Sequence, residues 1–284
     1  HGSMKKFASL LLASAVVALS ANAARAADVI ETPVYAEPAP AAIIEEAGGW
    51  YIRGDIDYHM ADMGGVTYAA GGGTNVFDSA ELDESWSLGG GIGYNVSKHF
   101  RVDVTADYWA KSDFRGSTSG SCGVGPACVS EDNSAMSAWV LLANAYADLG
   151  TYGGFTPYIG AGIGVAHVKW DDLSNTACDP VTGTCDPTVV HEGAKGWRAA
   201  GALMVGASYC LTDKAELDGG YRYTRVGGGN MFGNAVGAGP GYDDGFDVHE
   251  VRGGLRYSFG GGSNRCSAPA PQVVEYQPEP AVYK

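Results

Sequence analysis

The chain has 284 residues, 43 of them glycine, and carries a net charge of −14 at pH 7. So acidic a chain is a poor ligand for nucleic acids, whose phosphates attract basic proteins. No run of about 20 apolar residues is present, which excludes a membrane-spanning helix. The hydrophobic content of 45% is ordinary for a globular chain.

The first residues read as a leader that the mature protein lacks. Residues 1–3 look like a cloning remnant, and residues 4–26 have the basic start, apolar stretch and small-x-small end of a signal peptide. Cleavage after Ala26 makes Ala27-Asp28 the mature N-terminus. The leader holds three basic residues and no acidic one, so its removal lowers the net charge from −14 to −17.

Two segments rich in proline and glutamate flank the central part of the chain. Residues 27–48 hold no run that could form a core, and we expect them to be an extended linker. Residues 260–284 are similar in composition and too short for a folded domain, so we expect a tail. The folded domain is therefore expected at residues 49–259.

Strict alternation marks the strands of this domain. In residues 100–109 apolar side chains occupy one face and charged ones the other, a pattern with no helical interpretation. The pattern repeats as hairpins. The expected strands are residues 49–60, 86–94, 100–109, 135–149, 156–170, 196–210, 215–224 and 247–259. Four long loops, residues 61–83, 111–134, 171–195 and 225–246, alternate with three short turns.

The positions of the aromatic residues indicate which face is inside. A soluble barrel would turn its apolar face inward, whereas a transmembrane barrel turns it toward lipid. Trp86 and Tyr108 end the hairpin of residues 86–108 on one side, and Tyr94 and Phe100 end it on the other. Two aromatic belts around an apolar band are typical of a bilayer. The sequence therefore predicts an all-β fold, an eight-stranded antiparallel transmembrane β-barrel of the bacterial outer membrane.

This topology predicts an orientation and partners. Short turns of such barrels face the periplasm and long loops face the outside, so we expect both termini in the periplasm. Lipid and lipopolysaccharide of the outer membrane are the expected surroundings. Host or surface ligands are possible partners of the long loops, and no nucleic-acid partner is expected.

Charged side chains are expected to fill the barrel interior. They are Arg53, Asp55, Asp57, Arg101, Asp103, Asp107, Glu216, Asp218, Arg222, Glu250, Arg252 and Arg256. An eight-stranded interior is just wide enough for side chains to fill, which favours a salt-bridged plug over a selective pore. Inward glycines of residues 86–94 and 156–170 leave room for these groups, or for a thin water path.

The sequence contains little that indicates a catalytic or cofactor site. His59 and Glu250 both point inward on strands that must pair, but no serine or cysteine nucleophile accompanies them. Neither glycine-rich strand is followed by a helix, which argues against phosphate binding. Asp243, Asp244 and Asp247 lack the spacing of a calcium loop. We expect no enzyme activity, no cofactor and no metal.

Six cysteines fit an oxidising compartment. Six allow 15 pairings, but local spacing favours Cys122 with Cys128 and Cys178 with Cys185. Cys210 and Cys266 remain, both on the periplasmic side in the expected topology. A bond between them would hold the start of the tail beneath the barrel. The absence of a CxxC motif argues against zinc.

Three motifs resemble those of small porin-like, opacity-type outer-membrane β-barrels. They are Asn144-Ala145-Tyr146-Ala147-Asp148-Leu149, Pro157-Tyr158-Ile159-Gly160-Ala161-Gly162 and Leu217-Asp218-Gly219-Gly220-Tyr221-Arg222-Tyr223, and the nearest likeness is to alphaproteobacterial surface proteins. The resemblance implies the fold and the membrane. It also implies a hypothesis for attachment to peptidoglycan, in which the α-amine of Ala27 is acylated by diaminopimelate and Asp28 assists recognition.

Three functions stay open from the sequence. The first is a structural barrel that supports the envelope and is tied to the layer beneath it. The second is an adhesin or surface antigen that acts through its long loops, although these loops hold few aromatic anchors. The third is a narrow porin.

Overall fold

The computed structural model describes residues 49–259 together with Arg265 and Cys266. The chain divides into two units, His1–Ile44 and Glu45–Lys284, and only the second holds described residues. The expected signal peptide, the linker with Ala27 and Asp28, and most of the tail therefore lie outside the described residues. No helix in the described part has the length and apolar character needed to span a membrane.

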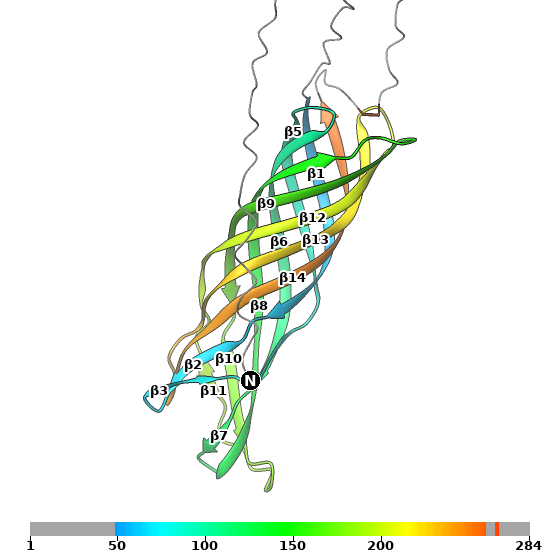
Figure 1. The fold of residues 1–284 in the computed structure, drawn as a ribbon. Coiled ribbons are helices and arrows are strands. Elements are labelled where there is room, and N and C mark those ends of the chain that lie inside the picture. The colour runs from blue at the N-terminus through cyan, green and yellow to red at the C-terminus, as the bar shows by residue number, and fades with distance from the viewer. Residues whose placement is uncertain (1–48, 260–264, 267–284) are drawn as a thin grey trace, which may run out of the picture. The chain divides into compact units, whose positions relative to one another are not determined.

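Eight antiparallel strands form a closed ring (Figure 1). In ring order they are β1 (Gly49–Met63), β5 (Ser85–Asn95), β6 (Phe100–Ser117), β8 (Gly125–Asp148), β9 (Phe155–Trp170), β12 (Lys195–Cys210), β13 (Ala215–Phe232) and β14 (Ala238–Phe259). The first and last of these, β1 and β14, pair from Trp50–Phe259 to Met63–Phe246 and close the barrel. The predicted eight-stranded fold is confirmed.

Burial alternates along the ring strands in the sense expected for a membrane barrel. In β1 the outward Ile52 and Ile56 are 49% and 52% exposed, whereas the inward Arg53 and Asp57 are buried. A soluble barrel would show the reverse. The outer wall is therefore apolar and the interior charged, as the alternation predicted.

Aromatic pairs lie near both ends of this apolar wall. Toward one end, Tyr58 contacts Trp86 and Tyr108 contacts Trp139, each with ring centroids 5.0 Å apart. Toward the other end, Trp50 contacts Tyr94 at 5.3 Å and pairs in register with Phe259. We call the bands of outward aromatic side chains at these two levels the aromatic belts. They lie where interfacial aromatics are expected in a bilayer.

Three of the four expected long loops are mostly strand, and the fourth, residues 171–195, holds two short strands, so the predicted extent of the loops was wrong. The added strands are β2 (Val66–Ala70), β3 (Gly73–Val76), β4 (Ser79–Leu82), β7 (Ser119–Cys122), β10 (Leu173–Cys178) and β11 (Val189–His191). Ring strands also run on: β6 pairs with β8 as far as Gly116–Asp132, and β13 with β14 as far as Phe232–Gly241. Beyond the bilayer the outward face becomes polar, so the alternation that identifies a membrane strand is lost.

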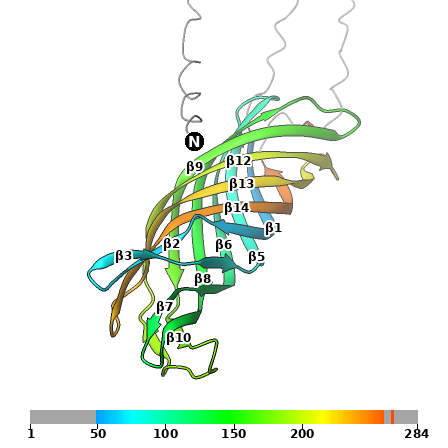
Figure 2. The ribbon, with the colours of Figure 1, turned by 60° about the horizontal axis from the view of Figure 1, so that its bottom comes forward.

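These extensions gather at one end of the barrel. Both views place β2, β3, β7 and β10 there (Figures 1 and 2). We call this the long-loop end. The opposite, short-turn end holds the connections β5–β6, β8–β9 and β12–β13.

Candidate functional site

The barrel interior is built around Arg222, whose side chain is fully buried. Its guanidinium donates hydrogen bonds to Glu250 at 2.5 and 2.8 Å and to Asp107 at 2.9 Å. Arg252 donates to Asp57 at 3.0 Å and to Asp107 at 3.2 Å. Two arginines thus share three carboxylates that come from β1, β6 and β14, which fixes these strands relative to one another.

A second cluster surrounds Arg53 and Asp103. Arg53 donates to both oxygens of Asp55, at 2.9 and 2.7 Å, and to Asp103 at 3.2 Å. Asp103 also accepts hydrogen bonds from Tyr51 at 3.0 Å and Asn144 at 2.8 Å. Every charge in this cluster therefore has a hydrogen-bonded partner of opposite sign or a polar neighbour.

A third cluster lies toward the short-turn end. Arg256 contacts Glu216 at 2.6 Å and Asp218 at 3.3 Å. Arg101 bonds Asp148 at 3.2 Å. Arg265, from the tail, forms ion pairs with Asp148 and Glu216. Arg265 was not predicted from the sequence, although its position next to Cys266 was the available signal.

All twelve charged residues expected in the lumen are buried in these three clusters. Inward glycines make the space for them. A Cβ at Gly89 would collide with the Asp107 carboxylate, and one at Gly162 would collide with the Asn144 side chain. Glycine at these positions lets a neighbouring strand place a large polar group in a narrow interior.

His59 and Glu250 do not form a histidine–carboxylate pair. They lie opposite each other in the β1–β14 register. Glu250, however, accepts hydrogen bonds from Arg222, Thr224 and Trp109. Neither ring nitrogen of His59 has a hydrogen-bond partner among the described residues, and its ring lies 5.4 Å from that of Trp109. The arrangement orients no general base.

An apolar layer, which the sequence analysis missed, fills the interior beyond Trp109 toward the long-loop end. Its largest fully buried members are Trp109, Phe114, Met136, Trp170, Leu173, Met231 and Phe246. The ring of Trp170 lies 5.6 Å from that of Phe114 and 6.0 Å from that of Phe246. Several members lie in segments that the sequence predicted to be loops, so their side chains were not predicted to point into the barrel.

One ion pair crosses this apolar layer. Arg198 bonds both oxygens of Asp243, at 2.5 and 2.7 Å, and Trp170 donates to Asp243 at 3.1 Å. Asp247 bonds Arg225 at 2.6 Å instead. Asp243 and Asp247, which were considered as calcium ligands, therefore each form an ion pair with an arginine.

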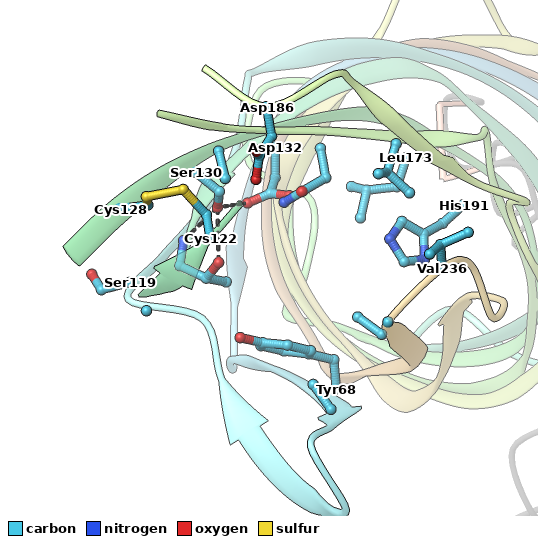
Figure 3. A pocket seen from close by; sticks show the side chains of 18 of the residues that line it. Tyr68, Ser119, Cys122, Cys128, Ser130, Asp132, Leu173, Asp186, His191 and Val236 are labelled. Atoms are coloured by element: carbon cyan, nitrogen blue, oxygen red, sulfur yellow. Dashed lines mark hydrogen bonds between the residues drawn. A yellow bond between two sulfur atoms is a disulfide. The ribbon is translucent and has the colours of Figure 1, made fainter. Parts of the chain in front are cut away.

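A cavity of about 310 Å³ lies among the strand extensions at the long-loop end (Figure 3). Tyr68, Leu173 and Phe232 form apolar parts of its lining, and the buried Asp132 and His191 form polar parts. Asp132 accepts hydrogen bonds from Ser130 at 2.5 Å and Asn175 at 2.6 Å. Burial raises the pKa of the Asp132 carboxyl, against these hydrogen bonds. The ring Nδ1 of His191 bonds the Gly233 carbonyl at 3.1 Å.

The structure contains three disulfides. Cys122–Cys128 and Cys178–Cys185 lie in the strand extensions, and the first of them borders the cavity. Cys210–Cys266 joins the end of β12 to the tail. Among the described residues, one group of candidate metal ligands lies close together, and it consists of Glu216 and the two sulfurs of this last disulfide.

Comparisons with known proteins agree with this architecture. A family model described as "Outer membrane protein beta-barrel domain" matches residues 10–259. An uncharacterized protein of Brucella abortus is 39% identical over 274 residues, which cover 84% of this chain and 94% of that protein. The outer membrane protein PagN of Salmonella typhimurium is 28% identical over 189 residues, 63% of this chain and 75% of its own length.

Two solved structures that match this chain share little of its sequence. Neisserial surface protein A is 16% identical with a TM-score of 0.37, over 75% of this chain and 100% of the other. The outer membrane protein OprG of Pseudomonas aeruginosa is 17% identical with a TM-score of 0.43, over 75% and 97%. A closed ring of eight strands, an apolar outer wall and a family match over most of the chain agree: this chain belongs to the outer membrane protein β-barrel family.

Proposed function

We propose that this protein is a closed, non-conducting barrel that supports the outer membrane mechanically. The observation that carries the proposal is the filled interior. Ion pairs centred on Arg222, Arg53 and Arg256 occupy the part toward the short-turn end, and the apolar layer around Trp170 occupies the rest. An ion passing through would have to disrupt buried salt bridges and then cross an apolar layer in which the Arg198–Asp243 pair is already hydrogen-bonded and cannot replace the hydration of the ion.

Electrical recording tests this proposal against the narrow-porin alternative. The barrel is refolded and inserted into a planar lipid bilayer, with a large-pore porin in the same bilayer type as the positive control. We expect no discrete conductance steps from this protein. Reproducible steps that scale with the number of inserted barrels would overturn the closed-barrel proposal and favour the porin.

We infer that the long-loop end faces the outside and the short-turn end faces the periplasm. The mature N-terminus then lies on the side of the peptidoglycan, and the linker of residues 27–48 gives it reach. At about 3.1 Å per residue in an extended polyproline-like state, it would span roughly 70 Å. In the attachment hypothesis, the α-amine of Ala27 attacks a diaminopimelate acyl group carried by a transpeptidase, and Asp28 aids recognition.

The attachment has a direct chemical test. Peptidoglycan from cells producing the protein is treated with protease, digested to muropeptides and examined by mass spectrometry. We expect an Ala27-Asp28 remnant on diaminopimelate, and a smaller linked fraction for Asp28→Ala. Finding a free α-amine on Ala27 in essentially all of the protein would end the attachment hypothesis and leave the closed barrel untouched.

Surface recognition is the second candidate, and the cavity at the long-loop end favours it. The cavity brings aromatic, carboxylate and imidazole groups together in one place, which is a composition that ligand sites often have. Cells carrying the intact protein are compared with cells carrying Asp132→Ala/His191→Ala for binding to host matrix or plant surface. Glu131→Ala, which changes an exposed neighbour outside the lining, is the matched control. Equal binding by all three would reject recognition through this cavity.

A further inference from the structure

We propose that Lys111, Lys169 and Lys195 form a binding site for the phosphate groups of lipopolysaccharide on the outer wall of the barrel. The inference rests on the proposed orientation, which places the long-loop end in the outer leaflet. It adds to the closed-barrel function a specific lipid partner and the residues that hold it. The three lysines come from β6, β9 and β12.

The register of the strands places these lysines directly above an aromatic belt. Tyr108, Trp139, His167 and Trp197 are consecutive cross-strand partners on the outward face of β6, β8, β9 and β12. The rings of His167 and Trp197 lie 4.9 Å apart. Two residues further toward the long-loop end, Ser137, Lys169 and Lys195 form the next row. Aromatic belts mark the depth of the headgroups, so this row lies at the level of the lipid phosphates.

Lys169 and Lys195 are direct cross-strand partners on the same face. Like charges placed directly opposite each other in an antiparallel pair destabilise the sheet, since their Cβ atoms are only about 5 Å apart. An anion bound between the two ammonium groups would remove that repulsion. The pairing is therefore unfavourable for the isolated protein and favourable for one that binds a phosphate.

Ion pairs with carboxylates of the protein neutralise only part of the cluster. Asp171 lies 2.5 Å from the Lys111 ammonium and 3.7 Å from that of Lys169. No ion pair of Lys195 is found among the described residues, and Asp171 is the one described carboxylate in ion-pair contact with the other two lysines. The side chains of Lys111 and Lys169 are 60% and 58% exposed, so their ammonium groups are accessible from the lipid side.

On the other side of the barrel at this level, described basic side chains have carboxylate partners. There Arg225 is matched by Asp247 at 2.6 Å, and His249 by Asp62 at 3.6 Å. The chain has a net charge of −14, yet these three outward lysines have among them a single described ion-pair partner, Asp171. Basic clusters next to a membrane bind phosphorylated headgroups, each lysine adding to the affinity. The charge, the depth and the outward direction together point to a lipid phosphate.

The test compares matched double variants of the full chain, refolded in a neutral detergent. Lys169→Gln/Lys195→Gln removes the opposed pair. Lys98→Gln/Lys214→Gln removes two exposed lysines at the short-turn end and is the control. The probe is diphosphorylated lipid A, with dephosphorylated lipid A and excess inorganic phosphate as further arms. Native mass spectrometry counts the lipid retained, and the temperature at which the compact gel band is lost reports stability.

We expect the Lys169→Gln/Lys195→Gln variant to bind diphosphorylated lipid A about 30-fold more weakly than the parent chain, and the control to match the parent. Without lipid, the variant should be at least as heat-resistant as the parent, because the repulsion is gone. Equal binding by both double variants, or equal binding of dephosphorylated lipid A, would overturn the proposal. Full displacement by inorganic phosphate would also overturn it, by showing a site for the free anion.

Discussion

At the scale of single residues, the interior is organised by charges that have no access to bulk water. Arg222, Asp107 and Glu250 are all fully buried and hydrogen-bonded to one another through the arginine. Outside the interior, Arg225 and Asp247 form a pair of similar length that is partly exposed. Burial makes the difference, because removing one partner of a buried pair leaves an uncompensated charge, whereas water replaces a lost partner at the surface.

This contrast gives a prediction for two aspartates. Asp107→Ala removes the carboxylate that Arg222 and Arg252 share, so each of these buried arginines loses one of its partners. We expect the substitution to lower the free energy of unfolding by about 3–5 kcal/mol. Asp247→Ala is the control and should cost about 1 kcal/mol or less. Urea unfolding of both variants in lipid vesicles, followed by tryptophan fluorescence, provides the measurement. Similar losses for the two variants would mean that the interior pairs are not isolated from water.

A second residue-scale prediction concerns close packing beside a glycine. The Cβ of Gly89→Ala would collide with the Asp107 carboxylate and displace it from its arginines. We expect a loss of about 1–3 kcal/mol in the free energy of unfolding, the usual cost of overpacking. Gly253→Ala adds the same methyl where nothing lies within 4 Å, and should be nearly neutral. An equal loss at both sites would show that the collision with Asp107 is not the cause, because alanine is not a weaker strand residue than glycine.

At the scale of elements, the strands continue well past the membrane and are joined there by shorter ones. The β13–β14 hairpin adds β2 to its edge, and β8 adds β7 and β10. Disulfides within the β7–β8 hairpin and just beyond β10 hold the tips of this assembly. The cavity depends on these extensions, because its lining comes from all of them and not from the membrane-spanning wall.

The tail attachment gives a prediction at this scale. Arg265 is largely buried against Asp148 and Glu216, and Cys266 is bonded to Cys210. We expect trypsin to cut slowly after Arg265 in the oxidised protein and rapidly in Cys266→Ser. Cys122→Ser/Cys128→Ser, which removes a disulfide at the opposite end, should leave the slow cleavage unchanged. Non-reducing peptide mapping that finds Cys210 or Cys266 free, or paired elsewhere, would contradict the tail disulfide.

At the scale of the whole molecule, closure of the ring is the dominant feature. Each of the eight ring strands pairs with two neighbours, so the ring itself has no open edge. Such a structure satisfies its backbone hydrogen bonds without water, which is the condition for crossing a bilayer with strands.

Closure predicts heat-modifiable migration on an SDS gel. Because every ring strand is paired on both sides, SDS should leave the barrel compact until it is boiled, and the unboiled protein should run faster. The same chain truncated before β14 cannot close and is expected to run identically with and without heating. Identical mobility of the full chain under both conditions would count against a closed barrel.

The fold class and the orientation of the barrel wall were predictable from the sequence. The distance that the strands extend beyond the membrane was not. Alternation in residues 86–109 identifies strands whose two faces meet lipid and interior. The same alternation, there and in the other predicted strands, assigned the twelve lumen charges to the inside. Beyond the belts the outward face is polar, so the alternation loses its contrast and true strands such as β7 and β10 read as loops.

The sequence by itself determined which side chains point inward, because a period of two allows only two faces. Only the tertiary structure decided how they combine. Arg222 meets Asp107 across 115 positions of chain, and Arg198 meets Asp243 across 45, through strand registers that no local pattern encodes. The apolar layer around Trp170 and the cavity at Asp132 likewise arise only when separate hairpins are brought together around one closed ring.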